Sequence, residues 1–322
     1  MTSQGRVIPR GGARVLPRDR RPPAGRRPAP PPPSPSRSAR RGRIGMRRGP
    51  CPARRATRAQ CGRQRFVAAR PREVAVQRLL NFPARVCGPP GSANGGWVSG
   101  TVAGVLGTGP AEVTLRAPTP VETELRLEWT TDEARLLDGS RLLADASPAE
   151  VPDAPPPVPL DVAVEAARDY PGLARHPFPG CVVCGSLRAP GDGMRVWPGP
   201  VPGRPDMLAA AWHVDPWLAD DDGGVQTAAV WGVLDCPTGW VHIRTGIVAV
   251  LGRHNVAMHQ RVAPGQTYVV VARDEGREGR KSWASAGLYD TSGQLMASAR
   301  ATWITLNSGD PRATSSSGES SR

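Results

Sequence analysis

The sequence predicts an α+β fold in which one apolar helix, followed by a meander of antiparallel strands, occurs twice. The stretches 93–106 and 223–237 are rich in small and apolar residues all round, which is typical of helices enclosed by other elements. Later runs alternate apolar and polar residues and are rich in Val, Thr, Tyr and Trp, as strands are. The proline-rich stretch 146–161 separates two segments with the same order of elements, which indicates an internal repeat.

A basic leader, residues 1–72, precedes the repeat. It holds 21 arginines and a single acidic residue, Asp19, and is rich in Pro, Gly and Ser. We predict that it is disordered, because it cannot bury enough apolar surface to offset its ordering entropy. It lacks the apolar region of a secretory signal, and its prolines oppose the amphipathic helix of a transit peptide. A phosphate-binding arm and an over-long reading frame both remain open, and the ratio of 41 arginines to one lysine favours the second.

The rest of the chain is mildly acidic. Residues 73–322 hold 20 arginines, one lysine and 27 acidic residues, so the basic charge belongs to the leader alone. We therefore expect no specific nucleic-acid partner. No apolar run approaches the roughly 18 residues of a membrane span. Without an export signal, the six cysteines are interpreted as reduced thiols of a cytoplasmic protein.

The element order places the domain boundaries. We predict a first copy at 73–147, a linker at 148–165 and a second copy at 166–307, with a disordered tail at 308–322. In the first copy, a helix is followed by two strand-like runs and a hairpin. In the second copy, Pro237 is expected to end the helix, because proline removes a helical hydrogen bond. The expected strands are 111–118, 122–132 and 134–147 in the first copy and 245–262, 266–276, 280–290 and 293–306 in the second.

Four motifs, in chain order, resemble hotdog-fold thioesterases, and their layout is similar to the double-hotdog type II acyl-CoA thioesterases. "NGGWVSG" (94–100) resembles the Gly-Gly start of their helix. "CVVCGSLRAPGDGMRVWPGP" (181–200) resembles the Cys-x-x-Cys-Gly opening strand of many members. "VLDCPTGWV" (233–241) resembles the Leu-Asp motif of the second helix, and "GRKSWASAGLYDTSGQLMAS" (279–298) resembles the closing strands. The resemblance covers about residues 82–307.

This resemblance implies a double hotdog, two copies of an antiparallel sheet wrapped around one helix. It further implies that the protein hydrolyses an acyl-CoA or acyl-carrier thioester without a cofactor. The alternatives are a non-catalytic hotdog protein that binds acyl thioesters and a hotdog hydratase or dehydratase. A hydratase needs an Asp and a His near the helix start, and 223–231 has no histidine. A double hotdog pairs its two sheets within one chain, so a monomer and a homodimer of double hotdogs both remain open.

Asp235 is the strongest candidate for a catalytic residue. It ends an otherwise apolar helix just before Pro237, where burial and the helix dipole both oppose a negative charge. On a helix it shares a face with Trp231. A carboxylate in this position should have a raised pKa, which suits a general base that activates water for attack on a thioester. The alternative is a structural carboxylate that reaches solvent or bonds a nearby donor such as Thr238.

The start of the first helix supplies polar groups for the substrate. Gly95 and Gly96 are expected to present backbone N–H groups to a developing oxyanion. Asn94 stands where many of the similar thioesterases have histidine, which leaves an amide donor without a base. We therefore expect substrate contacts from Asn94, Gly95, Gly96, Trp231 and Thr238.

The sheet should complete the catalytic group. Type II thioesterases pair the aspartate with a hydroxyl residue and a glutamine on the sheet, and this sequence has Ala301 and Thr302 where that glutamine would fall. Thr302, Ser285 and Ser298 are the candidate hydroxyl partners, and the sequence does not determine which face of its strand each one occupies. We assign Thr302 and Ser285 to catalysis beside Asp235.

We predict no metal site. Cys181 and Cys184 have the spacing of metal ligands, and His254 and His259 form an H-x₄-H pair. Structural zinc sites usually take two local pairs about a dozen residues apart, whereas these pairs lie about 70 residues apart. In a strand the two histidines would also point to opposite faces. The cysteines are therefore interpreted as small buried packing residues.

Overall fold

The computed structural model describes residues 76–307 and 309–310, all within one structural unit, Ala68–Arg322. The predicted leader, 1–72, lies outside the described residues, as does the predicted tail 308–322 except for Gly309 and Asp310. Among the described residues, no helix is both long and apolar enough to cross a membrane.

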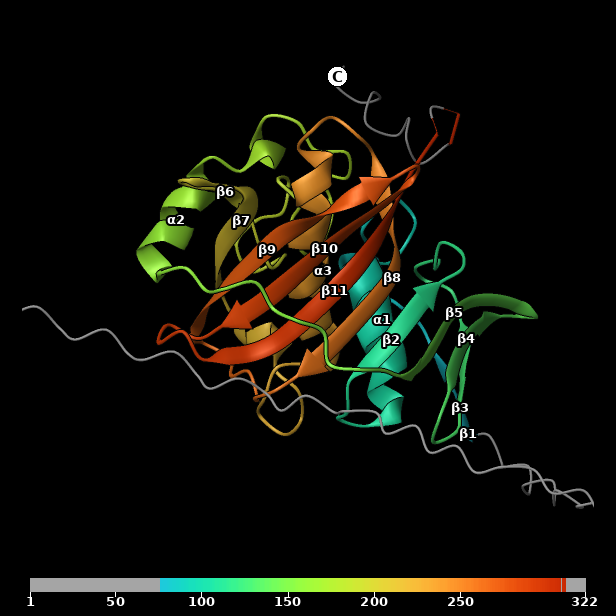
Figure 1. Ribbon diagram of the computed structural model, residues 1–322. Coiled ribbons are helices and arrows are strands. Elements are labelled where there is room, and N and C mark those ends of the chain that lie inside the picture. Colours follow the sequence, from blue (N-terminus) through green and yellow to red (C-terminus); the bar gives the residue numbers. More distant parts are fainter. Residues whose placement is uncertain (1–75, 308, 311–322) are drawn as a thin grey trace, which may run out of the picture. The chain divides into compact units, whose positions relative to one another are not determined.

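Eleven strands of the described residues form one sheet in which every neighbouring pair is antiparallel (Figure 1). Together with three helices they confirm the predicted α+β class. The strands are β1 (Val76–Leu80), β2 (Ala111–Leu115), β3 (Leu125–Trp129), β4 (Ala134–Asp138), β5 (Arg141–Pro148), β6 (Gly199–Val201), β7 (Arg204–His213), β8 (Ala249–Met258), β9 (Thr267–Glu278), β10 (Lys281–Tyr289) and β11 (Leu295–Thr305). The helices are α1 (Gly95–Ala103), α2 (Leu160–Arg168) and α3 (Thr227–Ile243), with short 3₁₀ turns at Ala84–Val86, Gly104–Leu106, Pro171–Leu173 and Pro216–Leu218.

The strand order repeats within the sheet. In the first half the order is β1-β3-β4-β5-β2, and α1 follows β1 in the chain. In the second half the corresponding order is β7-β9-β10-β11-β8, and α3 follows β7. The strands that follow the two helices, β2 and β8, pair with each other in the middle of the sheet. The two halves therefore repeat one topology and share one continuous sheet.

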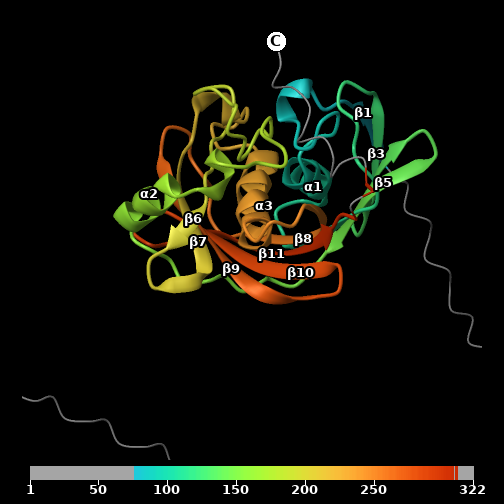
Figure 2. The same cartoon turned by 90° about the horizontal axis from the view of Figure 1, so that it is seen from above.

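Both α1 and α3 lie on the same face of the sheet, which curves around them (Figure 2). All residues of α3 from Ala228 to His242 are buried, as its uniformly apolar sequence predicts. On the opposite face, α2 packs against β6 and β7 and buries its own residues Ala163 and Ala166 in this contact. Strand β9 is therefore covered on both faces, which explains its run of consecutive buried residues.

The prediction that Pro237 ends the second helix is wrong, because α3 continues through it to Ile243. A proline inside a helix costs about 3 kcal/mol. Burial of the residues on both sides of Pro237 offsets this cost. Asp235 thus lies in the middle of the helix, and the expected opposition from the helix C-terminus does not apply.

Two further segments differ from the sequence-based expectations. The Cys-x-x-Cys segment forms turns between 182 and 193 and irregular backbone over 194–198 in place of an opening strand, and the next strand is the short β6. The predicted linker, 148–165, includes the last residue of β5, and helix α2 begins within it at Leu160. Its prolines leave the intervening residues 149–159 without regular structure.

Candidate active site

The site forms where α1 and α3 pack against each other at glycine residues. A Cβ atom on Gly96 would lie 2.5 Å from the Asp235 Cβ and 2.7 Å from the Trp231 carbonyl oxygen. A Cβ atom on Gly100, one turn later, would lie 2.7 Å from the Ala228 Cα. Real side chains do not tolerate such distances, so glycine at these positions lets the two backbones approach closely. This approach brings the N-terminus of α1 to the middle of α3.

Asp235 is held by the first turn of α1. Its Oδ2 accepts a hydrogen bond from the Gly96 backbone N–H at 2.8 Å and another from the Asn94 side-chain amide at 3.0 Å. Asn94 is also the N-cap of α1, because its Oδ1 accepts from the Trp97 N–H at 2.9 Å. A carboxylate at a helix N-terminus is stabilised by the exposed amides and the helix dipole. Asn94, Gly96 and Asp235 therefore lie in one site, and the Gly96 N–H serves the carboxylate and is not free for the oxyanion role expected from the sequence.

The second oxygen of Asp235 is different. Oδ1 is buried and has no hydrogen-bond partner among the described residues. Asp235 is 1% exposed, and within the described part of the chain no Lys, Arg or His forms a salt bridge with it. Burial raises its pKa to about 7, although the bonds from Gly96 and Asn94 act in the opposite direction. One oxygen is therefore fixed in place while the other keeps free lone pairs.

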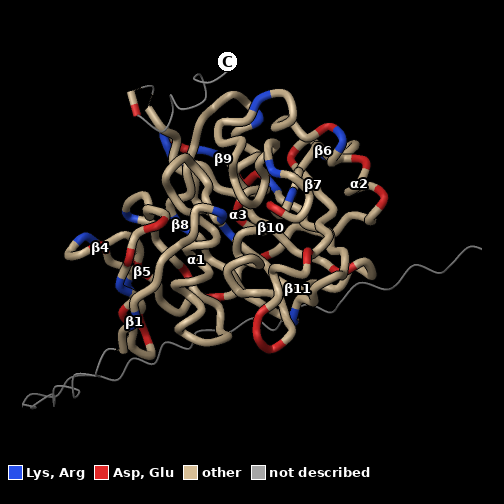
Figure 3. Tube along the Cα trace, turned by 180° about the vertical axis from the view of Figure 1, so that it is seen from behind, with Lys and Arg blue, Asp and Glu red and all other residues tan. Residues whose placement is uncertain are grey.

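Asp235 carries the only Asp, Glu, Lys or Arg side chain in α1 and α3. Figure 3 shows the charged residues of the described chain mainly along strands and surface loops, with the two helices almost uncharged. Burying an unpaired carboxylate costs several kcal/mol, so packing alone does not favour aspartate at this position.

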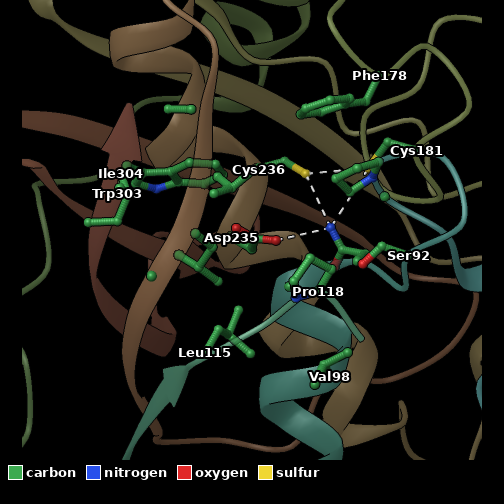
Figure 4. Close-up of a pocket in the computed structure, with 18 of the residues that line it drawn as sticks. Ser92, Val98, Leu115, Pro118, Phe178, Cys181, Asp235, Cys236, Trp303 and Ile304 are labelled. Atoms are coloured by element: carbon green, nitrogen blue, oxygen red, sulfur yellow. Dashed lines mark hydrogen bonds between the residues drawn. The ribbon is translucent and has the colours of Figure 1, made fainter. Parts of the chain in front are cut away.

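A cavity of about 310 Å³ reaches Asp235. It lies between the start of α1, the second part of α3, strands β2, β8 and β11 and the segment 176–184, and most of its lining is apolar (Figure 4). Gly95 also lines this cavity, and its backbone N–H has no acceptor among the described residues. The apolar side chains that line the cavity and are labelled in Figure 4 are Val98, Leu115, Pro118, Phe178, Trp303 and Ile304.

Arginines lie at the exposed edge of the cavity. Arg116 forms a two-point ion pair with Asp145, at 2.6 Å and 3.1 Å. The Arg141 side chain has no ion-pair or hydrogen-bond partner within the described residues, and the Arg280 side chain donates only to the Thr305 carbonyl at 3.1 Å. The guanidinium groups of Arg141 and Arg280 are thus free to bind an anion at the cavity edge.

Two other predicted contacts lie next to the site. Thr238 is fully buried and accepts a hydrogen bond from the Trp303 indole at 2.9 Å, so it positions a side chain that lines the cavity. Trp231 packs edge-on against His254, with ring centroids 5.3 Å apart, and does not line the cavity. Thr238 therefore supports the site indirectly, and Trp231 belongs to the packing between helix and sheet.

The structure does not bring Ser285 and Thr302 to Asp235, which corrects their assignment to catalysis. Along β10, Ala284 and Ala286 face the core around α3, so Ser285 points to the opposite face of the sheet. Along β11, Ala299 and Ala301 face the helix side, so Thr302 points away. The same alternation places Trp303 on the helix side, where its indole donates to Thr238. The irregularity at this point of the pairing lies on β8, where Gly252 is the extra residue.

Sequence spacing missed a cluster of thiols at the same cavity. Cys181, Cys184 and Cys236 are buried, line the cavity and have sulfur atoms within 4.8 Å of one another. His176 lies beside them, with its Nε2 3.4 Å from the Cys184 sulfur. Cys236 follows Cys184 by about 50 residues, so no local spacing revealed the group.

Comparison with solved structures finds proteins described as thioesterases or as having a hot dog fold, all at low sequence identity. A Lactobacillus plantarum protein assigned as an oleoyl thioesterase is 11% identical, with a TM-score of 0.45, and the match covers 73% of this chain and 98% of that one. The tesB protein of Mycobacterium avium subsp. paratuberculosis is 14% identical, with a TM-score of 0.49 over 72% of this chain and 93% of that one. A conserved protein with a hot dog fold from Alicyclobacillus acidocaldarius is 12% identical, with a TM-score of 0.43 over 72% and 93% of the two chains. No family model matches the chain, and no curated protein matches it in sequence.

Proposed function

We propose that the protein hydrolyses acyl thioesters with water that Asp235 activates. The observation that carries this proposal is Asp235, a buried carboxylate that lines a cavity and has an unpartnered Oδ1 beside an Oδ2 that two donors hold in place. A general base needs an available lone pair within reach of the reacting water and a fixed orientation. Asp235 has both.

The reaction follows from this geometry. A cavity water between Oδ1 and the thioester carbon gives a proton to Asp235 as its oxygen bonds to that carbon. The carbonyl oxygen becomes an oxyanion, for which the unpaired Gly95 N–H at the start of α1 is the available donor. Collapse of the tetrahedral intermediate breaks the carbon–sulfur bond, and the leaving thiolate takes up a proton from Asp235. The products are a carboxylic acid and a free thiol.

The cavity also indicates the class of substrate. Its apolar lining suits an acyl chain, and the free guanidinium groups of Arg141 and Arg280 at the edge suit phosphates. Coenzyme A and phosphopantetheine carriers combine a thioester with phosphate groups. We therefore infer an acyl-CoA or acyl-carrier thioester as the substrate.

We infer further that the two halves are a double hotdog. The repeated strand order, the helix after the first strand of each half and the β2–β8 pairing support this assignment. Asp235 comes from the helix of the second half, while Asn94 and Gly96 come from the first. The proposed site therefore needs both halves.

The test is thiol release from a panel of acyl-CoAs of increasing chain length, followed with a thiol-reactive dye. Asp235→Asn keeps the side-chain volume and an oxygen that can accept from Asn94 and Gly96. We expect it to lower kcat about a hundredfold or more while the melting temperature changes little. Asp206→Asn, an exposed carboxylate at the start of β7, is the matched control and should keep full activity.

Two results would reject the proposal. Full activity in Asp235→Asn would exclude the general base. Saturable binding of acyl-CoA without turnover of any panel member would identify a non-catalytic binding protein.

A further inference from the structure

The three thiols at the cavity come from two separate parts of the chain. Cys181 and Cys184 lie in the turns before β6, and Cys236 follows Asp235 on α3. Cys181 and Cys236 have their sulfur atoms 3.8 Å apart, and all three sulfurs lie within 4.8 Å of one another. A zinc ion with Zn–S bonds of about 2.3 Å sets its tetrahedral sulfurs about 3.8 Å apart. The cluster therefore has the dimensions of a thiolate site for a metal ion.

The Cys-x-x-Cys turn is shaped to present its sulfurs. Residues 182–184 form the turn, and Cys181 and Cys184 at its two ends are both buried. The Gly185 N–H donates to the Cys181 carbonyl at 2.9 Å, and a Cβ at Gly185 would lie 2.4 Å from that oxygen. This glycine keeps the turn closed, so the two cysteines are held on one side of it.

A side-chain donor faces the sulfurs from the start of α1. The Asn94 side-chain amide lies 3.8 Å from the Cys181 sulfur and 3.7 Å from the Cys236 sulfur (Figure 4). Such N–H contacts stabilise sulfur that carries negative charge. Segment 176–185 and helices α1 and α3 contain no lysine or arginine. A divalent cation would therefore balance the charge of thiolates that these elements leave unbalanced.

His176 is a neighbour of the cluster and not its fourth ligand. The Phe178 N–H donates to His176 Nδ1 at 2.9 Å, so the ring proton is on Nε2. That proton points at the Cys184 carbonyl at 3.2 Å. Both ring nitrogens are thus engaged, and a water of the adjoining cavity is the available fourth ligand.

We propose that Cys181, Cys184 and Cys236 bind one Zn²⁺ ion as thiolates, with a cavity water in the fourth position. Binding releases the three thiol protons to solvent. The ion would fasten the turn at 181–185 to α3 and thereby form one wall of the cavity. This inference does not depend on the proposed thioesterase activity, and it departs from our sequence-based expectation of no metal.

The first experiment uses the unaltered full chain. We expect elemental analysis of protein purified without chelator, or reconstituted with zinc, to give about one zinc per chain. After removal of zinc, Co²⁺ should give intense thiolate charge-transfer absorption in the near ultraviolet and tetrahedral bands in the visible range. Weak octahedral bands without charge transfer, copper in place of zinc, or no bound metal after reconstitution would each overturn the proposal.

Variants then assign the ligands. Cys236→Ser and Cys181→Ser should each lose the zinc and the charge-transfer absorption. Cys87→Ser removes a nearby thiol outside the cluster, and Cys51→Ser/Cys61→Ser removes the two cysteines outside the described residues. Both controls should retain about one zinc, and so should Asp235→Asn. Zinc retained by Cys236→Ser, or a Cys181–Cys236 disulfide found by mass spectrometry in protein isolated without reductant, would contradict the site.

Discussion

At the scale of single residues, Asp235 stands out because its charge has no ion-pair partner in the described chain. Its Oδ2 is bonded twice by the start of α1, whereas Oδ1 is buried and unpaired. A residue selected only for packing would be apolar at this position, since an unpaired buried carboxylate lowers stability. The cost is explained if the free oxygen acts on a molecule in the cavity.

The cavity arginines give a first prediction at this scale. We expect Arg141→Gln and Arg280→Gln each to raise KM for an acyl-CoA roughly three- to tenfold with little change in kcat, because an exposed phosphate contact contributes uniform binding. An acyl-N-acetylcysteamine thioester, which lacks the nucleotide, should be hydrolysed equally by the variants and the unaltered protein. Arg204→Gln, at the start of β7 and away from the cavity, is the control. An equal effect on both substrates would argue against phosphate binding.

His254 gives a second prediction, on pH and stability. It is fully buried, neither ring nitrogen has a partner among the described residues, and burial lowers its pKa from 6.5 to about 3. Between these two values the unfolded chain binds a proton that the folded chain does not, so His254 makes stability fall as the pH is lowered through this range. The loss approaches about 1.4 kcal/mol per pH unit.

Urea denaturation at pH 7, 6, 5 and 4 checks this. His254→Leu, which has a similar volume and no titrating group, should show a flatter profile than the unaltered protein. His213→Gln, a change at an exposed histidine of β7, should leave the profile unchanged. Parallel profiles for the His254 variant and the unaltered protein would contradict the prediction.

At the scale of elements, the contact between α1 and α3 depends on glycines spaced one turn apart. Gly96, Gly100 and Gly104 follow each other at intervals of four along α1 and the turn after it. Only the first two meet the backbone of α3 closely, and a Cβ at Gly104 would meet nothing nearer than 4.0 Å. The same residue type therefore has different roles along one helix face.

We expect Gly100→Ala to lower the free energy of unfolding by roughly 1–3 kcal/mol or more, because the new Cβ overlaps Ala228 and Trp231. Gly104→Ala should be neutral or stabilise by about 0.5–1 kcal/mol, since Gly104 has helical backbone angles and free space. Chemical denaturation of both variants measures the difference. Equal effects of the two substitutions would show that the helices are not held at the distance described.

At the scale of the whole described unit, one sheet and one pair of helices join the two halves. Strands β2 and β8 pair from Ala111 to Thr114, and α1 packs on α3 through the glycines above. The single sheet and the main core both draw residues from the two halves, and only a smaller cluster beneath α2 belongs to the second half alone. The two halves should therefore support each other during unfolding.

We expect a single cooperative unfolding transition for this unit. Far-ultraviolet circular dichroism and tryptophan fluorescence should give coincident curves in urea, and hydrogen exchange in β3–β5 and β9–β11 should rise at the same denaturant concentration. Exchange in the first half at a clearly lower concentration would show that the halves unfold independently.

The sequence by itself determined the features that depend on local pattern. Alternating residues placed β8 to β11, and uniformly apolar residues placed α1 and α3, because a helix or strand repeats its exposure at a fixed period. Asp235 could be singled out because a charge within an apolar helix is costly wherever the helix packs. Its neighbours Asn94 and Gly96 followed from the motif resemblance.

The tertiary structure alone decided the features that depend on contacts between distant residues. Burial on all sides carried α3 through Pro237, against the local preference of proline. Packing against α3 decided that Ala301 and Trp303 face the helices and that Thr302 points away, because strand alternation defines two faces but not which of them is covered. Cys236 joined Cys181 and Cys184 only because the chain folds back on itself. Spacing along a chain reports neighbours within one element, whereas packing decides which elements meet. Both the free carboxylate oxygen of Asp235 and the thiol cluster depend on the packing of distant elements.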